Sequence, residues 1–317
     1  MRAVTVATPG GTQVLEVRDV PEPVPGPGQV RIRVAAAAVN PVDVATRAGI
    51  MADLGLMPAF GSPGARQAVG LGWDVAGTVD AVGADVRGLA PGDTVIGLND
   101  RLDIPSGAYA DAIVLDAAAV SQAPRAVDLV HASTLPLNGT TALQALDALD
   151  LAPGDTLLVT GAAGAVGGYA VELAVQRGLR VVATAGAADE ALVREFGADH
   201  FVPKGEHLGD AVQALVPGGA DGALDAAVLG ISAQQAVRRG GAYVSVRSDV
   251  VPLPLRGIRV SNVLVRADAT QLGLLSALVD AGRLTTRVAD TLPLADAAKA
   301  HERFEEGGLR GRLVLIP

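Results

Sequence analysis

The sequence of 317 residues contains no cysteine. Disulfide bonds, thiolate metal sites and a cysteine nucleophile are therefore excluded. Aromatic residues are also scarce, at 3% of the chain, although half of all residues are hydrophobic. The core must consequently be built from valine, leucine and alanine, and the chain is long enough for two domains or one large one.

Long apolar runs and an excess of positive charge are missing as well. The longest uncharged stretches, such as residues 129–146, are interrupted by polar side chains and by Pro136, so we expect no transmembrane span. The formal net charge of −9 argues against nucleic acid or an anionic membrane as a partner. The opening residues MRAVTVATPG lack the apolar segment of a signal peptide. These absences predict a soluble, cytoplasmic enzyme.

The chain changes character twice along its length. Residues 1–119 contain short β-type runs separated by glycine and proline, which is typical of a partly antiparallel, barrel-like β domain. In residues 120–261 strands alternate with helical patterns, and this alternation indicates a parallel sheet covered on both faces. One of the expected helices runs through Arg238. Residues 262–317 return to mixed elements, and we expect them to rejoin the first domain.

The most informative segment is TLLVTGAAGAVGGY, residues 156–169. An apolar strand runs into glycines and then into a helix, and a second apolar strand at 180–185 completes a βαβ unit. Glycine lacks a Cβ, so it permits a sharp turn, a close approach to a bulky anion and tight packing of a helix on a strand. Backbone N–H groups and the positive end of the helix would face the phosphates. We therefore predict a dinucleotide site, with a plain structural turn as the alternative. Its residues are Gly161, Ala162, Ala163, Gly164, Ala165, Val166 and Gly167.

Segments spread over nearly the whole chain share a pattern with one family. They are AAAAVNPVDVATRAG (35–49), GLGWDVAGTVDAVG (70–83), PGDTVIGL (91–98), GAYADAIVL (107–115), LNGTTALQAL (137–146), the 161–167 loop and GRLVL (311–315). Together with the domain order, they resemble the medium-chain dehydrogenase/reductase superfamily, and most closely its zinc-free quinone oxidoreductase branch, the zeta-crystallin-like enzymes. The resemblance implies an α/β fold, in which a Rossmann domain with a doubly wound parallel sheet is joined to a GroES-like, partly antiparallel β-barrel catalytic domain.

The presence or absence of a metal decides the reaction class within that superfamily. Zinc-dependent alcohol dehydrogenases hold catalytic zinc through cysteines and a Gly-His-Glu segment, which corresponds here to Gly72-Trp73-Asp74. Zinc needs about three protein ligands, and we expect no metal in this chain. We interpret His131, His200, His207 and His301 as solvated or capping residues. Without a Lewis acid, oxidation of a simple alcohol is disfavoured, whereas reduction of an electron-poor acceptor needs none.

Asn40 is the first candidate for a catalytic polar group. It ends an apolar strand and precedes a proline, so a role as the N-cap of a short helix is equally open. The resemblance places the family's asparagine beside the nicotinamide and the substrate. We interpret Asp43 as a support of the helix start or of Arg47. Several related enzymes carry tyrosine where this chain has Ala45, and Tyr109, in a segment that borders the cleft in relatives, is a candidate replacement donor.

Further residues complete the predicted substrate pocket. Trp73 either walls the pocket or fills the core. Met51, Met57 and Phe60 lie in a segment interrupted by glycine and proline. This segment fits either an apolar lid over the substrate or a loop that packs on the core.

The end of the strand at 180–185 informs the choice of cofactor. NAD-binding folds place an acidic residue about 20 residues beyond the loop, but Thr184 and Gly186 stand here instead. Lys204 falls where related enzymes have a tyrosine that faces the 2′-phosphate of NADP, with a solvated loop lysine as the alternative. Asp189-Glu190 would repel that phosphate, and on balance we favour NADPH. Thr141 matches the family's threonine near the nicotinamide carboxamide, or is a helix-terminus hydroxyl.

Two enzymatic hypotheses and one binding hypothesis follow. The enzyme would transfer hydride from NADPH to a small apolar carbonyl or quinone substrate, either a quinone or an α,β-unsaturated ketone or enoyl compound. The loss of a tyrosine at Ala45 favours the second. The third hypothesis is a non-catalytic, zeta-crystallin-like NADPH-binding protein. Relatives often pair through the nucleotide-binding domain, so we expect a homodimer, with the strand at 241–246 as a candidate edge; light scattering would test this oligomeric state.

Overall fold

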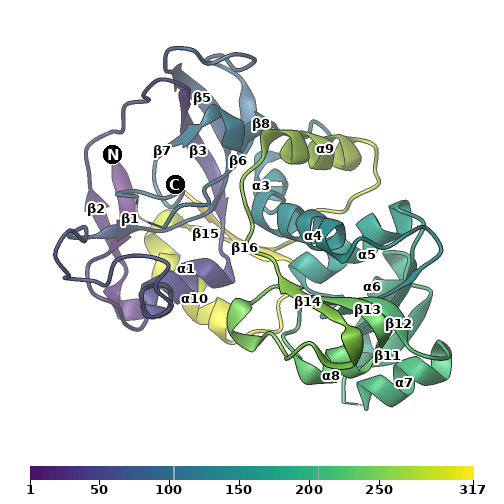
Figure 1. Ribbon diagram of the computed structural model, residues 1–317. Coiled ribbons are helices and arrows are strands. Elements are labelled where there is room, and N and C mark those ends of the chain that lie inside the picture. Colours follow the sequence, from purple (N-terminus) through teal and green to yellow (C-terminus); the bar gives the residue numbers. More distant parts are fainter. Residues whose placement is uncertain (103, 206) are drawn as a thin grey trace. The chain divides into compact units, whose positions relative to one another are not determined.

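The computed structural model describes residues 1–102, 104–205 and 207–317 (Figure 1). The chain packs into two compact units, each with its own sheet structure. Unit 1 comprises residues 1–137, 266–282 and 286–317, and unit 2 comprises residues 138–265 and 283–285. In the described residues, no helix is both long and apolar enough to cross a membrane.

Unit 2 is built on a six-stranded sheet in the order β11-β10-β9-β12-β13-β14, and every neighbouring pair in it is parallel. The order of a doubly wound sheet, in which the chain starts in the middle and proceeds first to one edge and then to the other, is therefore present. The strands are β9 (Thr156–Thr160), β10 (Arg180–Ala185), β11 (His200–Pro203), β12 (Ala220–Asp225), β13 (Val237–Ser245) and β14 (Arg259–Asn262).

The central strands of unit 2 are continuous buried runs because helices cover a parallel sheet on both faces. All five residues of β9 are buried, as are the last five of β10. The helices are α4 (Pro136–Leu149), α5 (Ala165–Gln176), α6 (Glu190–Glu195), α7 (Leu208–Leu215) and α8 (Ile231–Gln235). The predicted Rossmann sheet is confirmed.

Two predictions about the second half of this sheet are wrong. The helix expected to run through Arg238 ends at Gln235, and β13 begins at Val237. The strand at 241–246, predicted as an edge, lies inside the sheet because β13 pairs with both β12 and β14. The edge strand at this end of the sheet is β14, whose short sequence RVSN carries no apolar pattern. The homodimer itself stays a prediction.

Unit 1 contains a mainly antiparallel sheet in the order β15-β16-β3-β5-β6-β8, with β7 also paired to β3, and a smaller sheet β2-β1-β4. The large-sheet strands are β3 (Gln29–Ala38), β5 (Asp74–Val82), β6 (Thr94–Leu98), β7 (Ala112–Asp116), β8 (Val120–Gln122), β15 (Val288–Pro293) and β16 (Arg312–Ile316); the small sheet has β1 (Arg2–Val6), β2 (Glu16–Asp19) and β4 (Val69–Gly70). The helices are α1 (Pro41–Arg47), α2 (Ile50–Asp53), α3 (Leu129–Ala132), α9 (Ala269–Asp280) and α10 (Ala297–Glu305). The separate antiparallel domain is confirmed.

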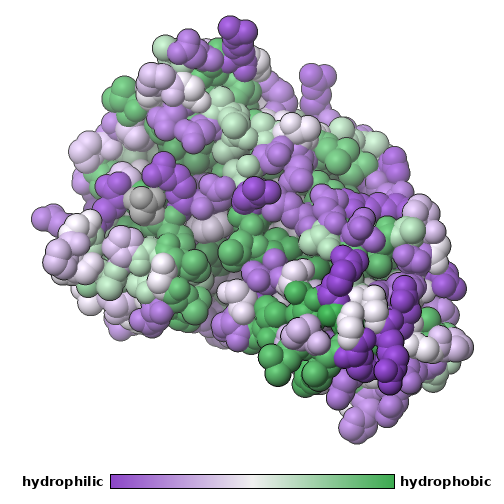
Figure 2. All heavy atoms as spheres, viewed as in Figure 1, coloured by the Kyte–Doolittle hydropathy of each residue, from purple (hydrophilic) through white to green (hydrophobic). Residues whose placement is uncertain are grey.

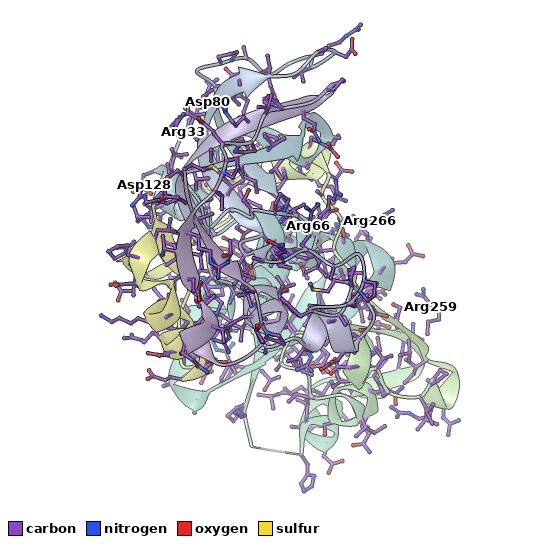
Figure 3. All side chains as sticks on the ribbon, turned by 90° about the vertical axis from the view of Figure 1, so that its left-hand side faces the viewer. Arg33, Arg66, Asp80, Asp128, Arg259 and Arg266 are labelled. Atoms are coloured by element: carbon purple, nitrogen blue, oxygen red, sulfur yellow. The ribbon has the colours of Figure 1, made fainter. Side chains whose placement is uncertain are left out.

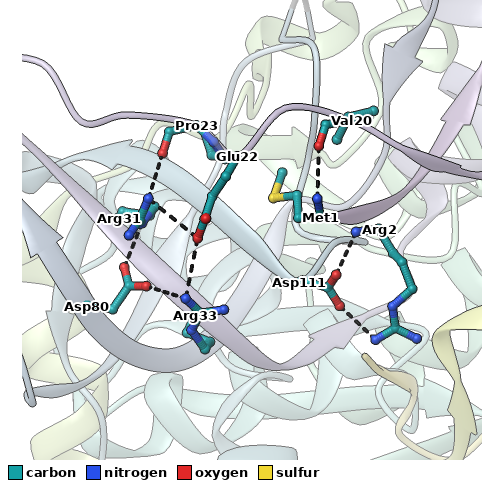
Figure 4. Close-up of polar contacts among 9 residues, drawn as sticks. All are labelled: Met1, Arg2, Val20, Glu22, Pro23, Arg31, Arg33, Asp80 and Asp111. Atoms are coloured by element: carbon teal, nitrogen blue, oxygen red, sulfur yellow. Dashed lines mark hydrogen bonds and ion pairs between the residues drawn. The ribbon is translucent and has the colours of Figure 1, made fainter.

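One ion-pair network on unit 1 ties neighbouring strands together (Figure 4). Arg31 and Arg33 of β3 both contact Asp80 of β5, at 2.8 and 2.7 Å, and both also reach Glu22. Figure 3 shows Arg33 and Asp80 side by side. Partial burial acts to raise the pKa of Asp80, but the hydrogen bonds and charges of the two arginines outweigh it and lower that pKa.

Apolar side chains are exposed on unit 2. Figure 2 shows hydrophobic surface over the part of unit 2 that Figure 1 labels α8 and β14. The exposed residues in these segments and in the loops beside them are Leu229, Ile231, Leu253, Leu255 and Leu264. Leu253 is the most exposed of these side chains, at 75%.

Candidate functional site

The turn between β9 and α5 has the geometry that a pyrophosphate requires. Gly161 adopts φ +62°, a left-handed conformation that glycine enters without strain. A Cβ on Gly167 would lie 2.2 Å from the carbonyl oxygen of Gly161, so α5 packs on the turn as closely as backbone allows. Gly164 is the N-cap of α5, and its own N–H donates to Gly161 O at 2.9 Å. The helix begins at Ala165, where its positive end can face an anion.

The residues of the predicted 161–167 loop thus form one continuous turn. Ala162 and Ala163 are buried, at 0% and 6% exposed, and Ala162 N–H donates to Thr184 O at 3.1 Å. This bond fixes the loop to the neighbouring strand β10. A turn of this kind, in which glycine at position 167 lets α5 pack directly against the backbone of Gly161, fits the phosphates of a dinucleotide.

The end of β10 carries the residues predicted to choose the cofactor. Lys204 N–H donates to Ala185 O at 2.7 Å, which places this exposed lysine beside the strand end that also contains Thr184 and Gly186. Glu190 pairs with Arg194 at 2.8 Å. Asp189 differs from it, since it is 7% exposed and its Oδ2 would lie 3.0 Å from a Cβ on Gly186. The sequence analysis expected both carboxylates to repel a 2′-phosphate. In the structure Glu190 is in an ion pair, whereas Asp189 is buried beside Gly186.

Thr141, the other predicted cofactor residue, lies within α4 and is 8% exposed. It occupies the second turn of that helix rather than its first residues. The helix-terminus interpretation is therefore wrong in detail, because α4 begins at Pro136, five residues earlier. Its role toward the nicotinamide stays a prediction.

In unit 1, Asp43 organises a fully buried polar cluster. Its Oδ2 accepts hydrogen bonds from Asn40 N–H at 2.9 Å and from the Tyr109 hydroxyl at 3.1 Å. Its Oδ1 accepts a third from Gly72 N–H at 3.0 Å. Asn40 is the N-cap of α1, so the expected support of the helix start by Asp43 is confirmed. Arg47, the other expected partner of Asp43, instead pairs with Glu305 at 2.6 Å.

Asp74 extends this cluster toward the start of α4. Its Oδ2 accepts from Asn40 Nδ2 at 2.7 Å and its Oδ1 from Leu137 N–H at 2.6 Å. Burial raises the pKa of Asp43 and of Asp74 to about 7 each, because the low-dielectric interior disfavours the charged form. The surrounding donors lower both pKa values, but by less. Burial also raises the pKa of Tyr109, so this phenol stays protonated and remains a donor.

The two residues predicted to be catalytic are therefore engaged within the protein. Both Asn40 and Tyr109 have 0% exposed area. Asn40 Nδ2 donates to Asp74 and to Ala38 O at 3.3 Å, and the Tyr109 hydroxyl donates to Asp43. The capping role of Asn40 is present in the structure, and contact of either residue with a substrate stays a prediction.

His301 corrects the view that all four histidines are solvated or capping. It is 0% exposed, its Nδ1 lies 3.5 Å from Arg47 Nη1, and its ring meets the Tyr109 ring edge-on at 5.9 Å between centroids. Burial lowers its pKa to about 4, with the nearby Arg47 acting in the same direction. The signal was present in the sequence: Ala297, Ala300 and His301 share the buried face of α10 at helical spacing.

A cavity of about 280 Å³ opens in the segment predicted as a lid. Met57 and Phe60 line it together with Arg66 and Val69, and its use as a substrate pocket stays a prediction. The remaining lining residues are Pro58, Gly64 and Ala65. The other predicted pocket residues lie elsewhere in unit 1: Asp43 in the buried cluster, Ala45 in α1, Met51 in α2, and Trp73 just before β5. Arg66 was missed because one arginine in a glycine-rich stretch has no distinguishing pattern.

The residues at the position of the catalytic zinc in alcohol dehydrogenases do not fit that metal. Asp74 presents both oxygens to N–H donors, and its neighbours Gly72 and Trp73 offer no metal-binding side chain. Within residues 1–102, 104–205 and 207–317, nowhere do three His, Asp or Glu side chains gather as metal ligands. The donor set gives no basis for a step through zinc.

The close contact of α5 with Gly161 predicts a sharp effect of one methyl group. In Gly167→Ala the new Cβ would overlap Gly161 O, so the loop must move. We therefore expect the Kd for a nicotinamide dinucleotide, measured by fluorescence titration, to rise by at least about tenfold. Gly209→Ala in α7 is the matched control, because its Cβ meets only atoms at 3.4 Å or more. Equal affinities in the two variants would show that the 161–167 loop is not the binding site.

The raised pKa of Asp74 predicts a pH dependence of stability. A carboxyl group whose pKa is raised in the folded state stabilises the fold fully below its unfolded pKa of about 4, and that contribution is lost as the pH rises through about 7. Asp74→Asn removes this titration. In urea unfolding between about pH 4.5 and 7.5, the free energy of unfolding of the variant should therefore rise relative to wild type.

Asp80→Asn provides the control for this pH series. Because the pKa of Asp80 is lowered, its contribution is lost only at more acidic pH, and its difference from wild type should stay constant over the same range. A flat difference for Asp74→Asn as well would contradict the raised pKa of the buried carboxyl.

Comparisons with known proteins agree with this architecture. Residues 26–125 match the alcohol dehydrogenase GroES-like domain, and residues 196–315 match the zinc-binding dehydrogenase family. A quinone oxidoreductase from Coxiella burnetii is 28% identical with a TM-score of 0.84, covering 100% of this chain and 99% of its own. An NAD-dependent alcohol dehydrogenase is 32% identical with a TM-score of 0.85, covering 100% of both chains.

Two further similarities concern cofactor and length. A mycobacterial protein complexed with NADPH is 26% identical with a TM-score of 0.82, covering 100% of both chains. Among curated proteins, a dehydrogenase from Aspergillus niger is 34% identical over 132 residues, which is 41% of this chain and 36% of the fungal protein. The full-length matches and the two-unit fold together identify the family. The chain belongs to the medium-chain dehydrogenase/reductase superfamily, in the branch of the quinone oxidoreductases.

Proposed function

We propose that the protein is a zinc-independent, NADPH-dependent reductase of an electron-poor acceptor, either an α,β-unsaturated ketone or enoyl compound or a quinone. The observation that carries this proposal is the glycine cradle between β9 and α5, where a Cβ on Gly167 would lie 2.2 Å from Gly161 O. In a chain of this superfamily, such a cradle fits the pyrophosphate of a nicotinamide dinucleotide. The quinone oxidoreductases among its structural neighbours support the acceptor class.

In this proposal, unit 2 binds the cofactor and unit 1 binds the acceptor. When bound, the reduced nicotinamide supplies a hydride. The phosphates bind at the 161–167 loop, to backbone N–H groups of the first turn of α5, which begins at Ala165. Met57, Phe60 and Val69 contact the apolar body of the acceptor, and Arg66 at the same cavity stabilises the negative charge that develops on its oxygen. A proton from water completes the two-electron reduction.

The position of Lys204 supports NADPH as the cofactor. The hydrogen bond from Lys204 N–H to Ala185 O places the backbone of this lysine beside the end of β10, and in folds of this type the adenosine ribose lies at that strand end, within reach of the lysine side chain. The pairing of Glu190 with Arg194 reduces the repulsion of a 2′-phosphate. Asp189 acts in the opposite direction, because a carboxylate at this strand end favours a free ribose hydroxyl and hence NADH.

Lysine chemistry gives a direct check of this choice. The chain contains two lysines, Lys204 and Lys299, and both are exposed. NADPH should protect Lys204 from acetylation while Lys299 reacts as before, as read by mass spectrometry. Lys204→Gln should raise KM for NADPH about tenfold and leave KM for NADH unchanged. A wild-type enzyme that strongly prefers NADH, with Lys204 equally reactive in both conditions, would contradict the proposal.

The acceptor class can be tested by following NADPH oxidation over quinones and α,β-unsaturated ketones. We expect turnover that is insensitive to chelator, with Arg66→Gln lowering kcat/KM about tenfold or more because charge on the acceptor oxygen is then less stabilised. Arg87→Gln, at an exposed arginine of the same unit, is the control. NADPH binding without turnover of any acceptor would instead favour a non-catalytic, zeta-crystallin-like binding protein.

A further inference from the structure

Strand β12 ends in a turn, residues 226–230, that backbone energetics disfavour. Val228 is β-branched, yet it adopts φ +62°, where its Cβ crowds the backbone. Gly230, at φ +59°, follows two residues later. A left-handed β-branched residue persists only where the surrounding structure holds it, and such positions cluster at functional sites.

Asp225, the last residue of β12, holds this turn. Its Oδ1 accepts a hydrogen bond from Leu229 N–H at 3.0 Å, and its Oδ2 accepts one from Gly230 N–H at 2.7 Å. The same carboxylate accepts from the Tyr243 hydroxyl and from the Thr160 hydroxyl, each at 2.6 Å. Asp225 has 0% exposed area, so four donors compensate the burial of its carboxylate.

Thr160 connects the turn to the phosphate loop. It is the last residue of β9, directly before Gly161, and its Oγ1 accepts from Ala227 N–H at 2.9 Å. Gly161 also lies against Ala227, because a Cβ on Gly161 would be 3.2 Å from the Cβ of Ala227. The 226–230 turn and the 161–167 loop are therefore in direct contact, at the carboxyl ends of two neighbouring parallel strands.

We propose that Asp225 and Thr160 are positioning residues of the dinucleotide site, and that the turn they hold is its second wall. This inference rests on the proposed function. A ligand of a doubly wound sheet lies outside the carboxyl ends of its strands, where this turn and the 161–167 loop meet. Because Asp225 fixes the turn in its strained form in the protein alone, binding does not have to order it. Neither side chain needs to touch the cofactor.

The test compares the same substitution at two ends of β9 in the full-length protein. Thr160→Val keeps the shape of the side chain but removes both hydroxyl bonds, to Asp225 and from Ala227. Thr156→Val is the matched control, because Thr156 is also buried and its hydroxyl has no hydrogen-bond partner among the described residues. Thr160→Ser, which retains the hydroxyl, is the conservative variant.

We expect Thr160→Val to raise the Kd for NADPH about tenfold, and Thr156→Val and Thr160→Ser to bind within about twofold of wild type. Hydrogen exchange of the backbone amides of residues 226–230 should be faster in Thr160→Val alone. Asp225→Asn should have the same two effects at temperatures where it remains folded.

The outcomes distinguish this inference from the proposed function. If wild type binds neither NADPH nor NADH, the proposed function fails. If wild type binds, but Thr160→Val binds as tightly and exchanges as slowly as Thr156→Val, the positioning role is wrong and the proposed function stands. If both valine variants lose affinity equally with equal losses of thermal stability, the effect is general to β9 and the inference is overturned.

Discussion

The structure of unit 2 depends on one close contact between backbones. Helix α5 crosses the end of β9 at a distance that leaves no space for a Cβ at Gly167, and the turn between them requires the positive φ of Gly161. This βαβ unit places β10 beside β9, and β12 pairs with β9 on its other side. The carboxyl ends of the parallel strands lie at this same edge of the sheet, and they carry Thr184 in β10 and Asp225 at the end of β12, with Lys204 directly after β11.

Unit 1 is organised by a different constraint, the cost of burying carboxylates. Asp43 and Asp74 are both fully buried and together receive five hydrogen bonds from backbone and side-chain donors. Asn40 and Tyr109, which carry the polar groups expected at a reaction centre, supply three of these. A buried carboxylate that loses one donor is left with an uncompensated charge, so these side chains are held in place. The cavity beside Arg66, in the described part of unit 1, has space for a small molecule.

The sequence was most informative where a pattern reflects backbone geometry. The 161–167 glycines, the alternating strands of residues 156–203 and the N-cap at Asn40 were all predicted, because each depends on local chemistry. The edge strand β14 and the path of β13 were not, because RVSN and VRRGG carry no periodic pattern and their pairing is decided by neighbouring strands. Long-range hydrogen bonds, such as that from Tyr109 to Asp43 across 66 positions, leave no trace in a single sequence.

The central claim is that this fold transfers a hydride from a reduced nicotinamide to an electron-poor acceptor. It is tested most directly with NADPH deuterated at C4 of the nicotinamide on each face in turn, with an α,β-unsaturated ketone as acceptor. The account predicts that one of the two labelled cofactors places a single deuterium on carbon in the reduced product, as read by mass spectrometry. A reduced ketone without deuterium from either cofactor would contradict it, as would a failure to oxidise NADPH with both this ketone and a quinone.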